Sequence, residues 1–202
     1  MRPLGLDDIT DQRAYERERE ARRAEIIELK RLRRVAIGPI VSAVFENRAT
    51  MRHQIQEMAR AEKLTTDEQI LAELAVYNPL VPGPGELSMT LFIELTEESA
   101  LRKWLPELVG IERSVELVLG PPGSQLRLGA AVEPSHGAQL TRETTTAAVH
   151  YVKIFLDGDA RRRFAAEPAR IAIVHPSYRH ETVLSMEQKA SLIDDWSEDQ
   201  ES

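Results

Sequence analysis

The order of hydrophobic and polar positions divides the chain into a helical first part and a β-rich second part. Three helices are predicted in the first part, each with a residue that can cap its first turn. They run from Thr10 or Asp11 to about Arg34, from Asn47 to about Lys63, and from Thr65 or Thr66 to Asn78-Pro79. Between the first two, residues 35–45 predict a strand that Gly38-Pro39 interrupts at a bulge or a sheet edge.

The second part alternates between short strands and short helices. Residues 86–95 place Leu87, Met89, Leu91, Ile93 and Leu95 on one side, which is the period of a half-buried strand. Further strands are predicted within residues 113–119, 126–132, 147–156, 171–174 and 182–184, and short helices at 99–108, 157–166 and 185–196. This pattern indicates an α+β fold with a mainly antiparallel sheet, a long N-terminal helix and packed short helices.

The length of 202 residues fits a single domain over residues 1–202. Within it we distinguish a helical arm (1–34), a part with one strand and helices (35–85), and a β-rich part with a C-terminal helix (86–202). A loop rich in Pro and Gly at residues 79–85 separates the last two parts.

Composition narrows the possible compartments and partners. The chain has no Cys, which fits a reducing cytosol, and no apolar run of about 20 residues that would span a membrane. We therefore expect a cytoplasmic protein with no membrane contact. The net charge of −7 argues against a nucleic-acid partner.

The charges are distributed unevenly along the chain. Residues 13–34 hold nine Arg or Lys with interspersed Glu, whereas the C-terminal end, DDWSEDQES, is acidic. Opposite charges at the two ends suggest an intramolecular clasp or head-to-tail association, and solvated charged faces explain the same pattern. We expect the arm to be an interface for a protein partner or for a homo-oligomer, through Tyr15, Arg22, Ile26, Leu29 and Arg33.

One face of the second helix concentrates polar groups. At about 100° per residue, Glu46, Thr50, His53 and Glu57 fall within a narrow arc, with Met51 and Met58 roughly opposite. A helix needs only its apolar stripe for packing, so this polar face is the best candidate site in the sequence.

His and carboxylates are the strong metal ligands available to a chain without Cys. A site for a divalent metal would use His53 and Glu57, one turn apart, together with His150 and His175 from predicted strands. The alternative is that His150 and His175 are core or capping residues with satisfied hydrogen bonds. No nucleophile elbow or phosphate-binding loop accompanies them.

Several segments resemble an uncharacterised bacterial family of roughly this length, a domain of unknown function. They are LDDI, ELKRLRRV, GPIVSAVFENRATMRHQIQEMARAE, YNPLVPGPGELSMTLFIEL, GIERSVEL and VHPSY, which together span nearly the whole chain. The resemblance brings no known activity or catalytic residues. It implies a context beside rubrerythrin-like di-iron proteins and iron–sulfur oxidoreductases, and so a role near peroxide or iron redox chemistry.

Two hypotheses from different classes follow. The first is a non-enzymatic accessory or interaction protein that serves a redox or iron-linked system. The second is a His/Glu metal-binding protein or oxidoreductase with an unknown divalent metal as cofactor. A metal assay on the purified protein separates them.

Overall fold

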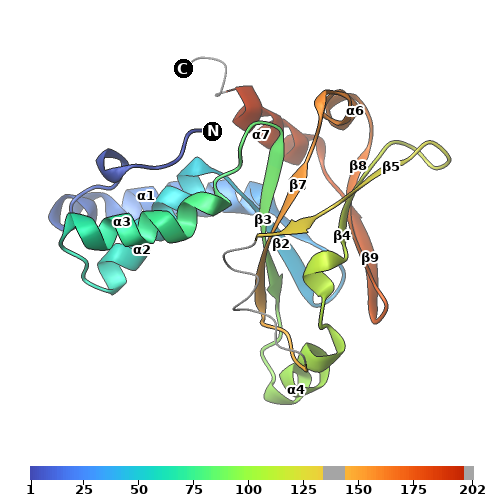
Figure 1. Cartoon of the computed structure of the whole chain (residues 1–202), viewed down its shortest axis with the longest axis horizontal. Helices are drawn as coiled ribbons and strands as arrows, with labels where there is room; N and C mark the ends of the chain where they lie inside the picture. The colour runs from blue at the N-terminus through green and yellow to red at the C-terminus, as the bar shows by residue number, and fades with distance from the viewer. Residues whose placement is uncertain (134–143, 198–202) are drawn as a thin grey trace.

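The computed structural model describes residues 1–133 and 144–197, so residues 198–202 of the acidic C-terminal end lie outside it. The α+β prediction is confirmed: the described residues form six α-helices and two antiparallel sheets (Figure 1). The first three helices project to one side of the sheets, and α4, α6 and α7 lie around the ends of the strands. No helix in the described ranges is long and apolar enough to cross a membrane.

The projecting part, which we call the helical lobe, consists of α1 (Gln12–Arg33), α2 (Arg48–Ala61) and α3 (Asp67–Tyr77) with the 3-10 turns η1 (Leu6–Asp8) and η2 (Asn78–Leu80). Asp11, Asn47 and Thr66 cap the three helices, as predicted, because each side chain accepts a free backbone N–H of the first turn. Leu4, Met51, Ile55, Leu74, Leu80 and Val81 form the small core of the lobe.

The predicted interrupted strand is a hairpin. β1 (Arg34–Ala36) pairs antiparallel with β2 (Val41–Glu46), and Gly38-Pro39 forms the turn between them rather than a bulge. The reversal is possible because Gly38 adopts φ +78°, a left-handed conformation that glycine tolerates. The Tyr178 hydroxyl closes this turn: it donates to the Ile37 carbonyl at 2.7 Å and accepts from the Ile40 N–H at 3.2 Å.

The β-body contains the two sheets and the remaining helices. The first sheet has the order β1-β2-β3-β7-β6 and the second the order β5-β4-β8-β9. Their further strands are β3 (Glu86–Ile93), β4 (Val115–Leu119), β5 (Leu126–Gly129), β6 (Ala131–Val132), β7 (Val149–Phe155), β8 (Ala169–His175) and β9 (Tyr178–Val183). The helical elements are α4 (Glu98–Glu107), η3 (Ile111–Arg113), α6 (Gly158–Ala166) and α7 (Met186–Ser197).

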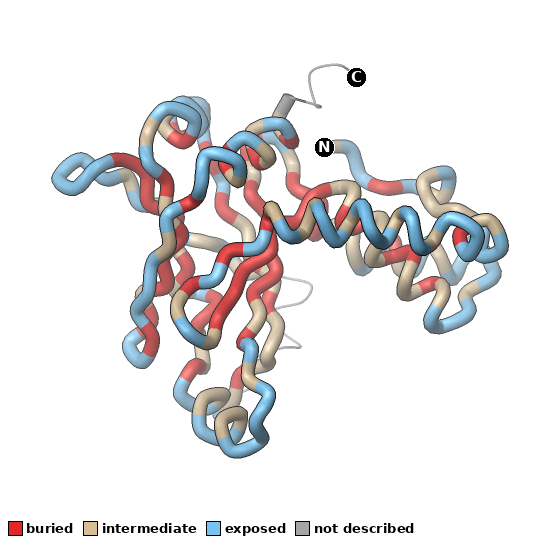
Figure 2. The backbone as a smooth tube through the Cα atoms, turned by 180° about the vertical axis from the view of Figure 1, so that it is seen from behind, coloured by how far each residue is buried: buried red, intermediate tan, exposed pale blue. Residues whose placement is uncertain are grey.

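The main hydrophobic core lies between the two sheets. The predicted alternation on β3 is confirmed, since Leu87, Met89, Leu91 and Ile93 are all buried in it. Ile154 of β7 lies opposite Leu87, and strands β4 and β8 supply the other side. Figure 2 shows the central strands of the sheets buried along most of their length, whereas the outer side of α1 is exposed.

Gly38→Ala should destabilise the protein. A Cβ built at this position lies 2.4 Å from His180 Cγ and 2.5 Å from the Tyr178 hydroxyl, which is held by its hydrogen bonds. The left-handed φ adds a separate cost of about 1–3 kcal/mol for a residue other than glycine. Urea unfolding of Gly123→Ala provides the control, because Gly123 has φ +91° and nothing within 4 Å of its Cβ. Equal losses in both variants would mean that the close approach at the hairpin is unimportant.

Candidate functional site

The seam between α1 and α2 holds a network around one carboxylate. Glu57 Oε1 accepts hydrogen bonds from the Tyr15 hydroxyl at 2.6 Å and from Arg19 Nε at 2.8 Å, and Oε2 accepts from Arg19 Nη2 at 2.8 Å. This two-pronged pairing is the strong geometry for an Arg and a carboxylate. The Arg19 hydrogen bonds are the main reason why the pKa of Glu57 falls to about 2. Burial, followed by the bond to Glu57, raises the pKa of Tyr15 above its ordinary value.

His53 lies beside this network but is not part of a charged pair. Its Nδ1 is 3.5 Å from the Tyr15 hydroxyl. Burial lowers the pKa of His53 below its ordinary value, and the nearby cations Lys30 and Arg19 lower it further, against the opposing effect of Glu57. The imidazole is therefore neutral at pH 7, and the Glu57 oxygens are already occupied by Arg19 and Tyr15.

The other half of the predicted polar face has a different position. Glu46 is the last residue of β2, not a helix residue, and its Oε1 accepts from the Thr90 hydroxyl of β3 at 2.7 Å. Thr50 is fully buried and completes the cap of α2: its hydroxyl accepts from the Asn47 N–H at 2.9 Å and donates to the Asn47 carbonyl at 3.0 Å. Glu46 therefore lies off the helix, because α2 begins at Arg48. Thr50 lies on α2, but its hydroxyl is used in the buried cap, so His53 and Glu57 are the members of the predicted face that line the seam.

The two strand histidines are satisfied within the β-body. His150 Nε2 lies 2.8 Å from the Thr146 hydroxyl and 2.9 Å from the Ala147 carbonyl, and burial lowers the pKa of His150. His175 Nε2 lies 3.1 Å from the Val109 carbonyl, and Nδ1 accepts the Ser177 N–H at 3.2 Å. Both ring nitrogens of His175 therefore have local partners, whereas His150 uses Nε2 and its Nδ1 lies 4.0 Å from the buried Glu112 carboxylate.

The predicted metal quartet does not assemble. His53 and Glu57 lie in the helical lobe, His150 in the first sheet and His175 in the second. In residues 1–133 and 144–197, no three His, Asp or Glu side chains gather in a way that could hold a metal ion. The expected convergence required α2 to pack over the strand histidines, whereas its buried residues contribute to the core of the lobe.

Two of the predicted interface residues are buried within the protein. Tyr15 and Arg33 are each 1% exposed. Tyr15 packs toward α2, and Arg33 lies between α1, β2 and α7, so neither can contact a partner. Arg22 pairs with Glu18 at 2.7 Å on the same helix, and Ile26 and Leu29 are half-buried.

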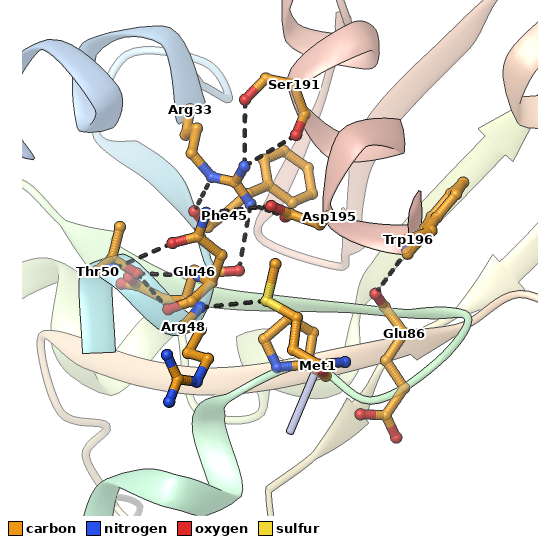
Figure 3. Close-up of polar contacts among 12 residues, drawn as sticks. Met1, Arg33, Phe45, Glu46, Arg48, Thr50, Glu86, Ser191, Asp195 and Trp196 are labelled. Carbon is orange, nitrogen blue, oxygen red and sulfur yellow. Dashed lines mark hydrogen bonds and ion pairs between the residues drawn. The ribbon is translucent and has the colours of Figure 1, made fainter. Parts of the chain in front are cut away.

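Arg33 is the centre of the junction between the lobe and the β-body, as Figure 3 shows. Nε donates to the Phe45 carbonyl at 2.8 Å, and Nη1 donates to the Ser191 carbonyl and hydroxyl at 3.1 and 3.2 Å. Nη2 donates to the Glu46 carbonyl at 3.3 Å and pairs with the Asp195 carboxylate. One buried guanidinium therefore connects the end of α1 to the end of β2 and to α7.

An open groove of about 460 Å³ lies between α1 and α2. It is bounded by the face of α1 adjacent to the one that carries Tyr15 and Arg33. Its wall on α1 and on the residue that follows α1 is formed by Arg23, Ile26, Ile27, Lys30, Arg31 and Arg34, and its wall on α2 includes His53 and Glu57. Within this wall, Arg23, Ile27, Lys30 and Arg34 follow one another at three or four residues, which places these four side chains along one helix face. We take this groove as the candidate functional site.

The number of cations in residues 13–34 is evident in the sequence, but their arrangement around an apolar residue was not predicted from it. Ile27 keeps 51% of its surface exposed between Arg23 and Lys30. The signal was available as a second stripe at residues 23, 27, 30 and 34, about 100° around the helix from Tyr15 and Arg33.

Glu57→Gln should flatten the acid dependence of stability. The folded-state pKa of Glu57 is about 2 and its ordinary value is 4.5, so the ionised group contributes stability above pH 4.5 that is lost as the pH falls toward 2. Solvent screening at this partly exposed pair limits the contribution to about 1–2 kcal/mol. Urea midpoints at pH 7 and pH 2.5 should show a wild-type advantage at pH 7 that is much smaller at pH 2.5, close to the folded-state pKa. An advantage of the same size at both pH values contradicts the assignment.

Comparison with known proteins places the chain among proteins whose activity is unknown. A crystal structure of a novel protein of unknown function from Burkholderia pseudomallei K96243 is similar, with 33% identity, a TM-score of 0.86, and coverage of 96% of this chain and 99% of that chain. No curated protein matches this sequence. The family model described as "Protein of unknown function (DUF3501)" matches residues 3–196, nearly the whole chain, and the protein therefore belongs to the DUF3501 family.

Proposed function

We propose that this protein is a non-enzymatic accessory protein whose helical lobe binds an acidic segment of a protein partner in the groove between α1 and α2. The observation that carries the proposal is a surplus of positive charge around an exposed isoleucine, in a protein of net charge −7. Such a site is complementary to a segment that presents carboxylates on both sides of an apolar side chain.

The surplus of charge follows from the ion pairs of the seam. Glu57 is the acidic residue of the groove, and Arg19 already neutralises it. Among the described residues, Arg23 and Lys30 have neither a hydrogen bond nor an ion pair through their side chains. Both cations are therefore available to a partner, at little cost in broken contacts.

The two remaining cations of the groove, Arg31 and Arg34, each form an ion pair within the chain. Arg31 pairs with Glu28 at 3.0 Å, but both side chains are more than two-thirds exposed, and such pairs contribute little. Arg34 pairs with Glu94 at 2.5 Å and lies over the Phe92 ring. Arg34 thus already has two partners within the chain and is less available to a ligand than Arg23 or Lys30.

The apolar part distinguishes a protein partner from a nucleic acid. Ile27 supplies contact area that a phosphate backbone does not use, and the groove contains no Phe, Tyr or Trp side chain on which a base could stack. The acidic remainder of the chain also repels a polyanion at long range. A short acidic and partly apolar protein segment fits these conditions best.

The partner that occupies the groove is expected to belong to a redox or iron-linked system. The resemblance noted in the sequence supports service to a redox or iron-linked system beside rubrerythrin-like proteins. Self-association through the acidic C-terminal end of a second copy is the competing occupant. The His/Glu metal-binding alternative has no comparable support, because the four side chains lie apart.

Photo-crosslinking from the groove tests the proposal in the source cells. A benzoylphenylalanine at position 27 should form a discrete adduct with an acidic segment of another protein, identified by mass spectrometry. Arg23→Glu combined with Lys30→Glu should reduce the adduct by about tenfold, the effect of losing about 1.4 kcal/mol. The same photoreactive residue at position 183 is the control, because Val183 is similarly exposed (61%) but lies on the β-body.

Three results would overturn this function: the absence of an adduct at position 27, an adduct that survives the double charge reversal, or an adduct to a second copy of the chain. Arg102→Glu combined with Lys103→Glu on α4 reverses the same number of exposed charges and should leave the adduct unchanged.

A further inference from the structure

We propose that the β-body carries a binding site for a small aryl carboxylate. An open pocket of about 590 Å³ lies where β5, β6, β7 and the start of β3 meet η2. Pockets of about 300–1,000 Å³ are typical for small molecules. The site shares no residue with the α1–α2 groove. It is therefore independent of the proposed partner binding and can be tested separately.

The pocket has one broad apolar surface. Phe155, at the end of β7, keeps 65% of its area exposed although it lies in a paired strand. It faces outward because its neighbour Ile154 points into the core. Leu128 and Val132 line the pocket as half-buried residues, and Gly129 and Ala131 leave space above the strands. A flat apolar group fits against the Phe155 ring.

A positioned cation lies on the same surface. Lys153 precedes Phe155 by two residues and therefore shares its face of β7. Its Nζ donates to Glu86 Oε2 at 2.8 Å, and the same oxygen accepts the Gly83 N–H at 2.8 Å. Trp196 donates to the Glu86 carbonyl at 3.2 Å, which fixes that residue further (Figure 3). Lys153 is therefore anchored within the pocket and does not extend freely into water.

The two cations that line the pocket, Lys153 and Arg127, both have N–H donors that are not used in hydrogen bonds among the described residues. An ammonium has three donors, and Lys153 uses one of them among the described residues. A guanidinium has five, and Arg127 on the opposite wall donates to Glu116 at 2.7 Å and to Gln125 at 3.5 Å. Of the two carboxylates that line the pocket, Glu86 already accepts two bonds, and Glu133 is buried and also has a partner. A ligand with a carboxylate next to a flat ring therefore matches this pocket. Its carboxylate supplies acceptors for Lys153 and Arg127, and its ring packs against Phe155.

Three isosteric probes test this chemistry: 2-naphthoate, 2-naphthamide and 2-naphthylmethylammonium. Titration of the full chain, followed by ligand-observed NMR and calorimetry, should show saturable binding of 2-naphthoate. Binding of the neutral amide should be about fivefold weaker, a difference of about 1 kcal/mol, and the cation should bind more weakly still.

Variants locate the binding. Phe155→Ala should weaken 2-naphthoate and 2-naphthamide alike by about fivefold, and since Phe155 is exposed, the change leaves the fold intact. Lys153→Gln should remove the preference for the acid over the amide, with circular dichroism confirming the fold. Val183→Ala, an exposed apolar residue elsewhere on the β-body, should leave both affinities unchanged.

No saturable binding of 2-naphthoate would overturn the site. Equal affinity for the acid and the ammonium probe, or an unchanged affinity in both Phe155→Ala and Lys153→Gln, would do the same. None of these outcomes bears on cross-linking from position 27, so failure of this site and failure of the proposed partner binding are distinguishable.

Discussion

The buried guanidinium of Arg33 is the interaction on which the arrangement of this protein depends. Removing a cation from water costs several kcal/mol unless its donors find acceptors. Arg33 meets that cost with the carbonyls of Phe45 and Glu46, with Ser191, and with the Asp195 carboxylate. These acceptors come from the end of β2 and from α7, two elements far apart in sequence. The end of α1 can therefore occupy only the position at which all of them converge.

The rest of the helical lobe follows from this fixed point. With Arg33 inward, Tyr15 lies on the same side of α1, five turns earlier, and meets Glu57 of α2. Arg19 completes that seam and neutralises its carboxylate. The next face of the helix, with Arg23, Ile27 and Lys30, is left open beside α2. The same sequence segment thus supplies internal anchors on one face and a charged, partly apolar surface on the adjacent one.

Local patterns predicted most of the fold, and tertiary contacts decided the site. Caps at Asp11, Asn47 and Thr66, and the alternation along β3, are determined by neighbouring residues, so they could be found in the sequence. The Gly38 turn was misjudged because its closing partner, Tyr178, lies 140 residues away. Glu46 was placed on a helix that begins two residues later. The four predicted metal ligands were individually sound choices, but only packing could show that they occupy three separate parts of the molecule. Likewise, two residues of the stripe predicted as an interface, Tyr15 and Arg33, are buried against the chain's own α2, β2 and α7.

Arg33 holds the helical lobe in place on the β-body, and hydrogen exchange of the Arg33→Met variant is the sharpest test of this role. Loss of the guanidinium leaves Asp195 buried without its partner, and such losses cost about 3–5 kcal/mol. Peptides from α1, α2 and α3 should exchange at least about tenfold faster than in the wild type, whereas β3, β4 and β8 should keep their protection. Unchanged protection across the lobe, or an equal loss in lobe and sheets, would contradict this account.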